Sequence, residues 1–406
     1  MPVTRESVPL ADAVPSSVRA PVRPRERFLV FGAPEITQAE IDEVVATLKS
    51  GWIGTGPKTA RFQADFAAYK GVPAAAAVSS ATAALHLCMV ARDLEPGDEV
   101  ITTALTFCAT ANAVLHAGGT PVIADIDPQT GNLDPADVRR KITPRTKALL
   151  PVHLAGRSCD MDALGAIARE HGFWMIEDCA HAIETQWRGQ HAGTFGDFGC
   201  FSFYVTKNVV TGEGGMVIAR RQEDLDRIRI LALHGMSRDA WKRFSDSGYK
   251  HYSVVECGFK NNLTDLQASI GLHQLARVEA SWRRRQQIWR AYDAALAGLP
   301  IGLPTPTAAH EKHAYHLYQV RIDPKRCGVT RDDFLDRMTA HGIGVGVHYL
   351  SLAEHPYYQR ELGWKPESCP HALAFGRETV SLPLTPKLSD ADVADVVEAV
   401  RRSLAG

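Results

Sequence analysis

The stretch CFSFYVTKNVVTGEGGMVIA, residues 200–219, holds one lysine, Lys207, between two strand-like apolar runs. Aromatic and β-branched neighbours would desolvate its ammonium and lower its pKa, as an imine-forming amine requires. Taken alone, however, such a lysine is more typical of an exposed position at the end of a strand. The glycines of GEGG predict a tight turn that returns the chain into a sheet, and not a dinucleotide-binding loop, because a strand follows them. The role of Lys207 therefore depends on what the rest of the chain places around it.

Around this stretch, residues 74–220 alternate short apolar runs with helix-like segments. The runs expected to form strands are AAAAVSS, EVITTALTF, TPVIADI, KALLPVHL, FWMIEDCA, GCFSFYV and GGMVIA. Helices are expected at residues 82–92, 109–117, 135–142 and 161–170. Such alternation predicts βαβ crossovers and an α/β fold with a mostly parallel central sheet and helices on both faces. The pattern alone does not exclude a closed β-barrel surrounded by helices.

The chain is expected to have four parts. Residues 1–27 carry five prolines, five arginines and three acids, which predicts a flexible N-terminal extension. Residues 28–262 are expected to form the large α/β domain, and residues 263–299 a long linking helix capped by Thr264 or Asp265. Residues 300–406 are expected to form a smaller α+β domain, with strands at HLYQVRI and IGVGVHYL and a closing helix at 390–404.

The composition favours a small molecule or another protein as the partner. Of 406 residues, 45 are Lys or Arg and 46 are Asp or Glu, so the net charge of -1 provides no bulk attraction to nucleic acid or to an anionic membrane. Eight cysteines without a C-x-x-C pair are typical of reduced, buried thiols and not of a disulfide framework or a metal site. Polar residues interrupt both long uncharged runs, and no secretory signal is evident. We therefore expect a soluble, cytoplasmic protein.

Two features upstream of Lys207 bear on its chemistry. Asp178 ends the apolar run of MIEDCAHA, where an unpaired carboxylate would be costly, so it should face a cation or several donors. A simple capping role for Asp178 fits the spacing equally well. In VSSATAALHL a helix is expected to begin near Ala81, and its free N–H groups with the hydroxyls of Ser80 and Thr82 would make a phosphate seat. A plain N-cap is the simpler interpretation of that segment by itself.

Together, the three features suit one cofactor, pyridoxal 5'-phosphate (PLP). A lysine forms an imine with it, a carboxylate keeps its pyridine nitrogen protonated, and a helix start anchors its phosphate.

The sequence resembles the DegT/DnrJ/EryC1/StrS family of PLP-dependent sugar aminotransferases, within fold type I of the PLP enzymes. The resemblance runs over nearly the whole chain from about Phe31. The motifs that carry it are SGWIGTGP, VSSATAALHL, TFCATANAV, PVHLAGRSCDMDAL, IEDCAHAIET, FSFYVTKNVVTGEGGMV, GFKNNLTDLQASIGLHQL, GVHYLSL and SLPLTP.

The resemblance implies a role for each residue that matches a family motif. Lys207 is implied as the lysine that binds the cofactor and then moves the proton of the reaction. Asp178 would pair with the pyridine nitrogen, His181 would lie near the ring oxygen, and Phe107 would stack on the ring. The implied phosphate contacts are Ala81, Thr82 and Ser202, with Lys260 or Asn262 of a second subunit.

Other matched positions are implied to line the substrate side: Trp52, Gly54, His316, His348 and Tyr349. The chain departs from the family at two places. Ala81 stands where the family usually has glycine, which tightens the phosphate pocket slightly. Asn261 replaces the usual aromatic residue of the motif GFKYN, which weakens the case for the contact from the second subunit.

The resemblance further implies a homodimer with active sites at the subunit interface. Its activity would be transfer of an amino group from L-glutamate to a keto group of a nucleotide-linked (deoxy) sugar, for polysaccharide or secondary-metabolite biosynthesis. Pyridoxamine phosphate (PMP) would carry the amino group between the two halves of the reaction. Two alternatives remain open, a PMP-dependent sugar dehydratase and a non-catalytic PLP-binding regulatory protein. The first typically has His where Lys207 stands, and the second need not retain all three cofactor features.

Overall fold

A computed structural model of the chain describes residues 27–237 and 252–405. The predicted N-terminal extension therefore lies, except for Arg27, outside the described residues. In the part of the chain that the structure describes, every helix is too short or too polar to span a lipid bilayer.

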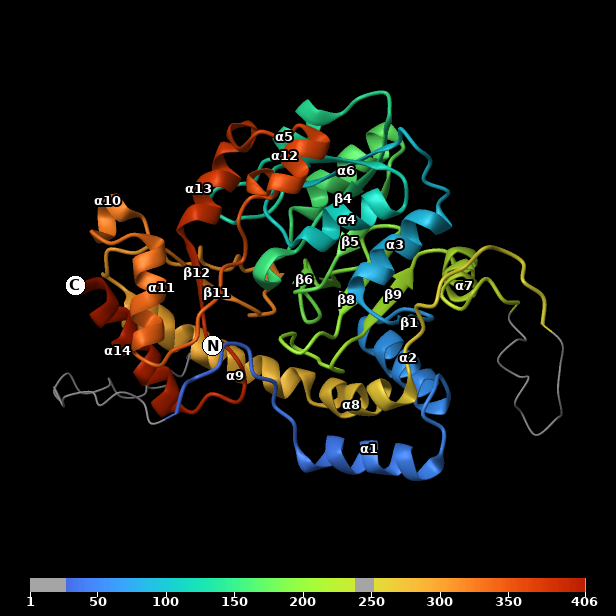
Figure 1. Cartoon of the computed structure of the whole chain (residues 1–406), viewed down its shortest axis with the longest axis horizontal. Helices are drawn as coiled ribbons and strands as arrows, with labels where there is room; N and C mark the ends of the chain where they lie inside the picture. The colour runs from blue at the N-terminus through green and yellow to red at the C-terminus, as the bar shows by residue number, and fades with distance from the viewer. Residues whose placement is uncertain (1–26, 238–251, 406) are drawn as a thin grey trace, which may run out of the picture.

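The centre of the molecule is an open seven-stranded sheet (Figure 1) with the strand order β1-β9-β8-β5-β4-β2-β3. Neighbouring strands from β3 to β8 are parallel, whereas β9 pairs antiparallel with both β8 and β1. The mostly parallel sheet is confirmed, all seven expected strands are present, and the open order excludes the barrel. The strands are β1 Ala76–Val78, β2 Glu99–Thr103, β3 Thr120–Ala124, β4 Thr146–Leu150, β5 Trp174–Asp178, β8 Phe198–Ser202 and β9 Gly215–Ala219.

Helices cover both faces of this sheet, and the alternation of side chains along each strand explains why. Val217 of β9 belongs to a buried cluster with residues of α3 and α7. Its neighbours Met216 and Ile218 point to the opposite face and pack with α2 and α8. The helices of the large domain are α1 Gln38–Ser50, α2 Pro57–Lys70, α3 Ala81–Ala91, α4 Cys108–His116, α5 Pro135–Lys141, α6 Met161–His171 and α7 Gln222–Leu231.

The expected long linking helix is present as two helices, α8 Asp265–Ala276 and α9 Val278–Leu296. Thr264 caps α8 as expected, in a capping box with Gln267. Arg277 separates the two helices with φ -107° and ψ 10°. Its guanidinium donates a 2.8 Å hydrogen bond to the carbonyl of Glu35 and also contacts Glu40. The break is thus tied to the segment that leads into α1, which packs against α8 (Figure 1).

The C-terminal part has its own core, built from α9, α11 Arg331–Ala340, α14 Asp390–Ala405 and a two-stranded antiparallel sheet, β11 Tyr318–Arg321 with β12 Thr379–Leu382. The strand expected at IGVGVHYL is wrong, because this segment makes only isolated bridges, from Ile343 to Leu29 and from Gly346 to Ser381. A Cβ on Gly344 would lie 2.9 Å from the Leu29 carbonyl oxygen, so this glycine allows a close approach of two backbones without a regular ladder.

The expected closing helix is confirmed as α14 Asp390–Ala405. The remaining elements are short, and several of them lie between the two cores. They are β6 Gln186–Trp187, β7 Gln190–His191, β10 Glu311–Lys312, α10 Pro324–Cys327, α11 Arg331–Ala340, α12 Pro356–Leu362, α13 Pro370–Glu378 and the 3-10 turns η1 Leu154–Gly156, η3 Leu352–Glu354 and η4 Pro366–Ser368.

Candidate active site

Asp178 is the last residue of β5, at the carboxyl end of the parallel sheet, where ligands of such folds bind. Its side chain is buried and accepts hydrogen bonds from the amide of Ala180 at 3.1 Å and the hydroxyl of Thr110 at 3.0 Å. Burial raises the pKa of Asp178, while these two donors and the positive charge of Lys207 oppose that rise. A cation placed against this carboxylate would be stabilised strongly, because little water screens it.

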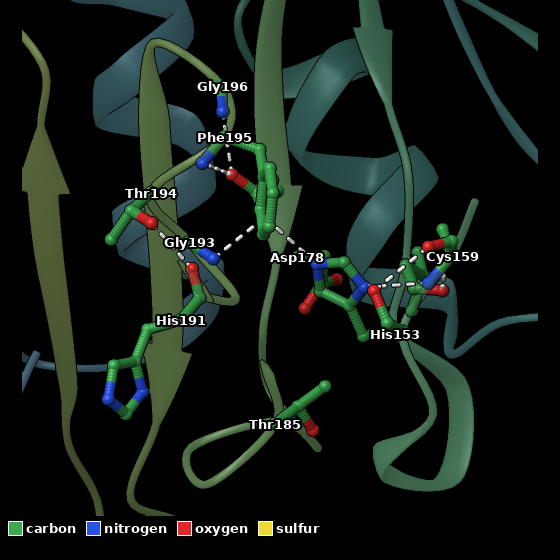
Figure 2. Close-up of polar contacts among 12 residues, drawn as sticks. His153, Cys159, Asp178, Thr185, His191, Gly193, Thr194, Phe195 and Gly196 are labelled. Carbon is green, nitrogen blue, oxygen red and sulfur yellow. Dashed lines mark hydrogen bonds and ion pairs between the residues drawn. The ribbon is translucent and has the colours of Figure 1, made fainter. Parts of the chain in front are cut away.

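The preceding residue, Glu177, points to the other side of β5 and anchors the strand. Its carboxylate accepts hydrogen bonds of 2.7 Å from the amides of Gly193, Phe195 and Gly196, and one of 3.0 Å from His153 Nε2. Figure 2 shows the 193–196 loop on one side of the strand and His153 on the other. A buried carboxylate with four donors cannot move without leaving one of them unsatisfied. The Asp178 backbone is therefore held at a fixed strand end.

His153, Glu177 and Cys179 place potential metal ligand atoms within 4.8 Å of one another. His153 Nδ1 already accepts a 3.1 Å hydrogen bond from the Cys159 amide. Because the imidazole and the carboxylate are both occupied by such donors, the geometry fits a hydrogen-bond network better than a metal site.

Lys207 lies in the connection between β8 and β9. Its backbone amide donates to the Tyr204 carbonyl at 2.9 Å. The amide of Thr211 donates to the Phe203 carbonyl at 2.8 Å, and this bond joins the two ends of the loop that carries Lys207. Its side chain is only partly exposed. Burial lowers the pKa of Lys207 to about 8, against the opposing effect of the negative charge of Asp178. At neutral pH the amine is still mostly protonated, but its neutral, nucleophilic fraction is far larger than that of an ordinary lysine.

The start of α3 is formed as a helix cap with free amides beside β9. The Ser80 hydroxyl accepts from the Ala83 amide at 3.1 Å, so the amides of Ala81 and Thr82 have no partner within the helix. A Cβ on Gly215 would lie 2.5 Å from the Ser80 carbonyl carbon, so only glycine lets β9 pass this close. Gly215 is the register partner of Ser202, which brings Ser202 to the same helix start.

Two neutral histidines and a tyrosine form one wall near Lys207. His181 Nδ1 accepts from the Ala155 amide at 3.2 Å, so its hydrogen is on Nε2 and is donated to the Tyr349 hydroxyl at 3.1 Å. The ring of His316 lies 4.4 Å from that of His181. Burial, together with the nearby charge of Lys207, lowers the pKa of both histidines well below the usual value.

Phe107 precedes α4 and is 56% exposed, with its ring 5.8 Å from that of Tyr349. An exposed aromatic ring at this position offers a flat surface to a planar ligand. His348 is held by the Ser381 hydroxyl at 2.9 Å and stacks on Phe31. Burial lowers the pKa of His348 to about 4.

The other predicted residues gather around the loop before α2. Trp52 is 43% exposed and donates through Nε1 to the Thr55 carbonyl at 3.1 Å. Asn262 donates to the Thr55 hydroxyl at 2.7 Å, and the Gly54 carbonyl accepts from the Asp265 amide at 2.8 Å.

The side chain of Lys260 is exposed, and its backbone forms an isolated antiparallel β-bridge with Leu233. The contacts within one chain therefore leave the predicted role of Lys260 or Asn262 in a second subunit as a prediction.

Some residues of the site were not singled out from the sequence. Thr110 follows Phe107 by one helical turn, and Glu177 and His153 lie inside apolar runs without a motif of their own. Asn208 offered the clearest signal, because it is a polar residue directly after the lysine and is followed by two apolar residues.

Comparison with known proteins gives a consistent result. The model of the DegT/DnrJ/EryC1/StrS aminotransferase family matches residues 34–401. The chain is 47% identical over 387 residues to the spore coat polysaccharide biosynthesis protein SpsC of Bacillus subtilis, covering 95% of this chain and 99% of that protein.

Solved structures of sugar aminotransferases show the same fold. The putative sugar aminotransferase Spr1654 from Streptococcus pneumoniae, solved in PMP and PLP forms, matches with a TM-score of 0.86 and 34% identity. The PMP-form match covers 93% of this chain and 98% of that one. Helicobacter pylori PseC, an aminotransferase involved in the biosynthesis of pseudoaminic acid, matches with a TM-score of 0.86 and 26% identity, over 93% and 100% of the two chains.

Proposed function

Because this chain belongs to the DegT/DnrJ/EryC1/StrS family of PLP-dependent sugar aminotransferases, we propose that it moves an amino group from L-glutamate to a keto group of a nucleotide-linked sugar. The observation that carries the proposal is the arrangement of Lys207, Asp178 and the start of α3 at one end of the sheet. The name of the Bacillus relative supports a role in polysaccharide biosynthesis. We further propose that the enzyme acts in the cytoplasm.

The residues present fit PLP. The free amides of Ala81 and Thr82, with the Ser202 hydroxyl, would hold the phosphate where Gly215 leaves room. Asp178 would pair with the pyridine nitrogen, which its buried carboxylate keeps protonated. Phe107 would cover one face of the ring, and His181 would lie beside the ring oxygen.

Bound PLP supplies the electron sink for the reaction. Lys207, in its neutral form, would hold the cofactor through Nζ. The same amine would serve as the base that takes the proton from the donor Cα and as the acid that returns it. Tyr349 accepts from His181, so its own hydroxyl hydrogen is free to bond an oxygen of the substrate. Donor and sugar would use one site in turn, which predicts ping-pong kinetics.

We also propose a homodimer with active sites at the subunit interface. α1 exposes Ile41, Val45 and Leu48 at 47%, 41% and 55%, a spacing that puts them on one helix face, and Trp52 and Ile53 follow as exposed apolar residues. A continuous exposed apolar surface favours coverage by another chain. Because Trp52 and Asn262 both contact Thr55, the same coverage would bring Asn262 near a second active site.

The alternatives predict different behaviour of Lys207. A PMP-dependent dehydratase does not need this lysine, and a regulator would not exchange amino groups. We expect the PLP-loaded protein to be yellow and to lose that colour when L-glutamate is added. Lys207→Ala should abolish the change, whereas Lys365→Ala, which alters an exposed lysine after the end of α12, should retain it.

A panel of UDP-, GDP- and dTDP-linked 3-keto and 4-keto sugars should then restore the colour with the true acceptor. If neither glutamate nor any other amino donor changes the spectrum, amino transfer is refuted.

A further inference from the structure

The residue after Lys207 is a buried asparagine whose amide has partners on both sides. Asn208 Nδ2 donates to the Glu184 carboxylate at 2.9 and 3.0 Å and to the Ala314 carbonyl at 3.0 Å. Asn208 Oδ1 lies 2.9 Å from His316 Nδ1. The side chain therefore joins the loop that carries Lys207 to two other segments. One lies between β5 and β6 and carries Glu184, and the other precedes β11.

These partners fix the orientation of the amide. The Ala314 carbonyl can only accept a hydrogen bond, so the nitrogen of Asn208 must face it and the oxygen must face His316. An amide oxygen is only an acceptor, so the hydrogen of the His316 ring must be on Nδ1. Since burial keeps the pKa of His316 well below its usual value, the ring is neutral and its Nε2 carries no hydrogen.

The position of His316 makes this tautomer relevant to the active site. Its ring contacts that of His181, and the charge of Lys207 helps to lower the pKa of both rings. A neutral Nε2 can accept a hydrogen bond there, whereas the other tautomer would present an N–H. The two histidines thus have opposite tautomers, with the hydrogen on Nε2 in His181 and on Nδ1 in His316.

Glu184 stands behind Asn208 as a fully buried carboxylate. Burial raises the pKa of Glu184 to about 7, and the positive charges of Arg285 and Lys312 and the bond from Asn208 oppose this rise. Ionised or not, one of its oxygens remains an acceptor for Asn208 Nδ2. Its contribution is therefore to hold the amide in the orientation that His316 requires.

We propose that Asn208 and Glu184 are positioning residues that lock His316 in the Nδ1–H tautomer, so that its second ring nitrogen, in a ring packed against His181, is a hydrogen-bond acceptor and not a donor. The inference rests on the proposed role of Lys207 for its consequence in catalysis. The tautomer itself is a property of the chain without cofactor. The two can therefore be tested separately.

The first test is nitrogen NMR of the cofactor-free protein with ¹⁵N-labelled histidine, with the His316 signals assigned by their loss in His316→Gln. We expect wild-type His316 to carry its hydrogen on Nδ1. Asn208→Ala should abolish this preference, whereas Glu184→Gln should retain it because the amide carbonyl of the new side chain still accepts from Asn208 Nδ2. A hydrogen on Nε2 in the wild type overturns the proposal without any variant.

Asn132→Ala is the matched control. Asn132 is also buried, and its amide also bonds three groups, the carbonyls of Arg157 and Ser158 and the amide of Leu154. We expect a similar loss of thermal stability in this variant and no change in the His316 tautomer. If Asn132→Ala alters the tautomer as much as Asn208→Ala does, general loosening explains the effect and the proposal fails.

The second test measures amino transfer from L-glutamate by the PLP-loaded variants. Asn208→Ala should lower kcat about tenfold or more with little change in KM, because the orientation of a group at the reacting centre and not donor binding is lost. Glu184→Gln should retain most of the wild-type kcat, because its amide carbonyl still accepts from Asn208 Nδ2. An inactive wild type would refute the proposed amino transfer, and the NMR result would still decide the inference about His316.

Discussion

Replacing Lys207 by methionine should stabilise the cofactor-free chain at neutral pH. Burial lowers the pKa of Lys207 from 10.5 to about 8, so folding at pH 7 moves a charged group from water to a site that stabilises the charge less well. A difference of this size corresponds to about 3 kcal/mol of folding free energy. The side chain is partly exposed, so screening by water makes this figure an upper limit.

The gain should depend on pH in a defined direction. Below about pH 8 the lysine holds its proton in the folded and the unfolded chain, and the full cost is present. Between about 8 and 10.5 the unfolded chain binds a proton that the folded chain has released, so the free energy of unfolding of the wild type rises with pH. The methionine variant lacks this rise. The difference between the two proteins should therefore shrink across that window.

Urea denaturation of the cofactor-free proteins at about pH 7 and about pH 9.5 measures both effects. Lys365→Met is the control, because Lys365 is exposed and its replacement should change stability little at either pH. One opposing effect is expected, since Asp178 loses the cation that lowers its pKa and will hold a proton more readily. A methionine variant no more stable than the wild type at neutral pH, or a gap that does not narrow at high pH, would refute the reasoning.

Three further changes test other parts of the site. Gly215→Ala should force the backbones of β9 and Ser80 apart, at a cost of about 1–3 kcal/mol of stability. The variant should also bind PLP more weakly in a fluorescence titration. PLP binding unchanged from wild type would contradict the proposed phosphate site at the start of α3. Glu177→Gln should lower the free energy of unfolding, measured in urea, by about 3 kcal/mol or more, because an amide NH₂ group would face backbone N–H donors. A loss smaller than that caused by the same change at an exposed glutamate would show that Glu177 does not anchor β5. Tyr349→Phe should leave the His181 Nε2–H without its acceptor. We expect amino transfer to slow about tenfold or more, while the affinity for PLP stays nearly unchanged. A wild-type rate in this variant would exclude a role for Tyr349 in the mechanism.

The fold was predictable where local pattern and tertiary packing agree. All seven strands of the sheet appear at apolar runs bounded by polar residues, because a strand buried on both faces must be apolar along its length. The segment IGVGVHYL has the same appearance, but Gly344 lies against the backbone of Leu29, Gly346 lies against the side chain of His348, and no ladder forms. The break at Arg277 had no local signal either, since neither proline nor glycine marks it. Both departures from the predicted structure involve contacts with the N-terminal segment, through Leu29 for IGVGVHYL and through Glu35 for Arg277.

The candidate site shows the same division. Lys207, Asp178 and the start of α3 were singled out as candidates because each has a chemical signature in its own motif. Thr110 and Glu177 were not, because their importance lies in which groups the fold brings to them. A threonine hydroxyl on α4 that reaches the Asp178 carboxylate 68 residues away leaves no trace in the neighbouring sequence.

Two pairs of consecutive residues share one design. In the first pair, the Asp178 carboxylate accepts from Ala180 and Thr110 while Glu177 is bonded to four donors on the opposite side of the strand. In the second pair, Lys207 is the proposed reactive amine, and the amide of Asn208 directly after it is fixed by three groups. A buried polar side chain with all its partners resists displacement, because any shift leaves a donor or an acceptor unsatisfied. The geometry of the reactive group is thus set by its neighbour in the chain, and the costliest substitutions around this site should include residues that never touch the cofactor.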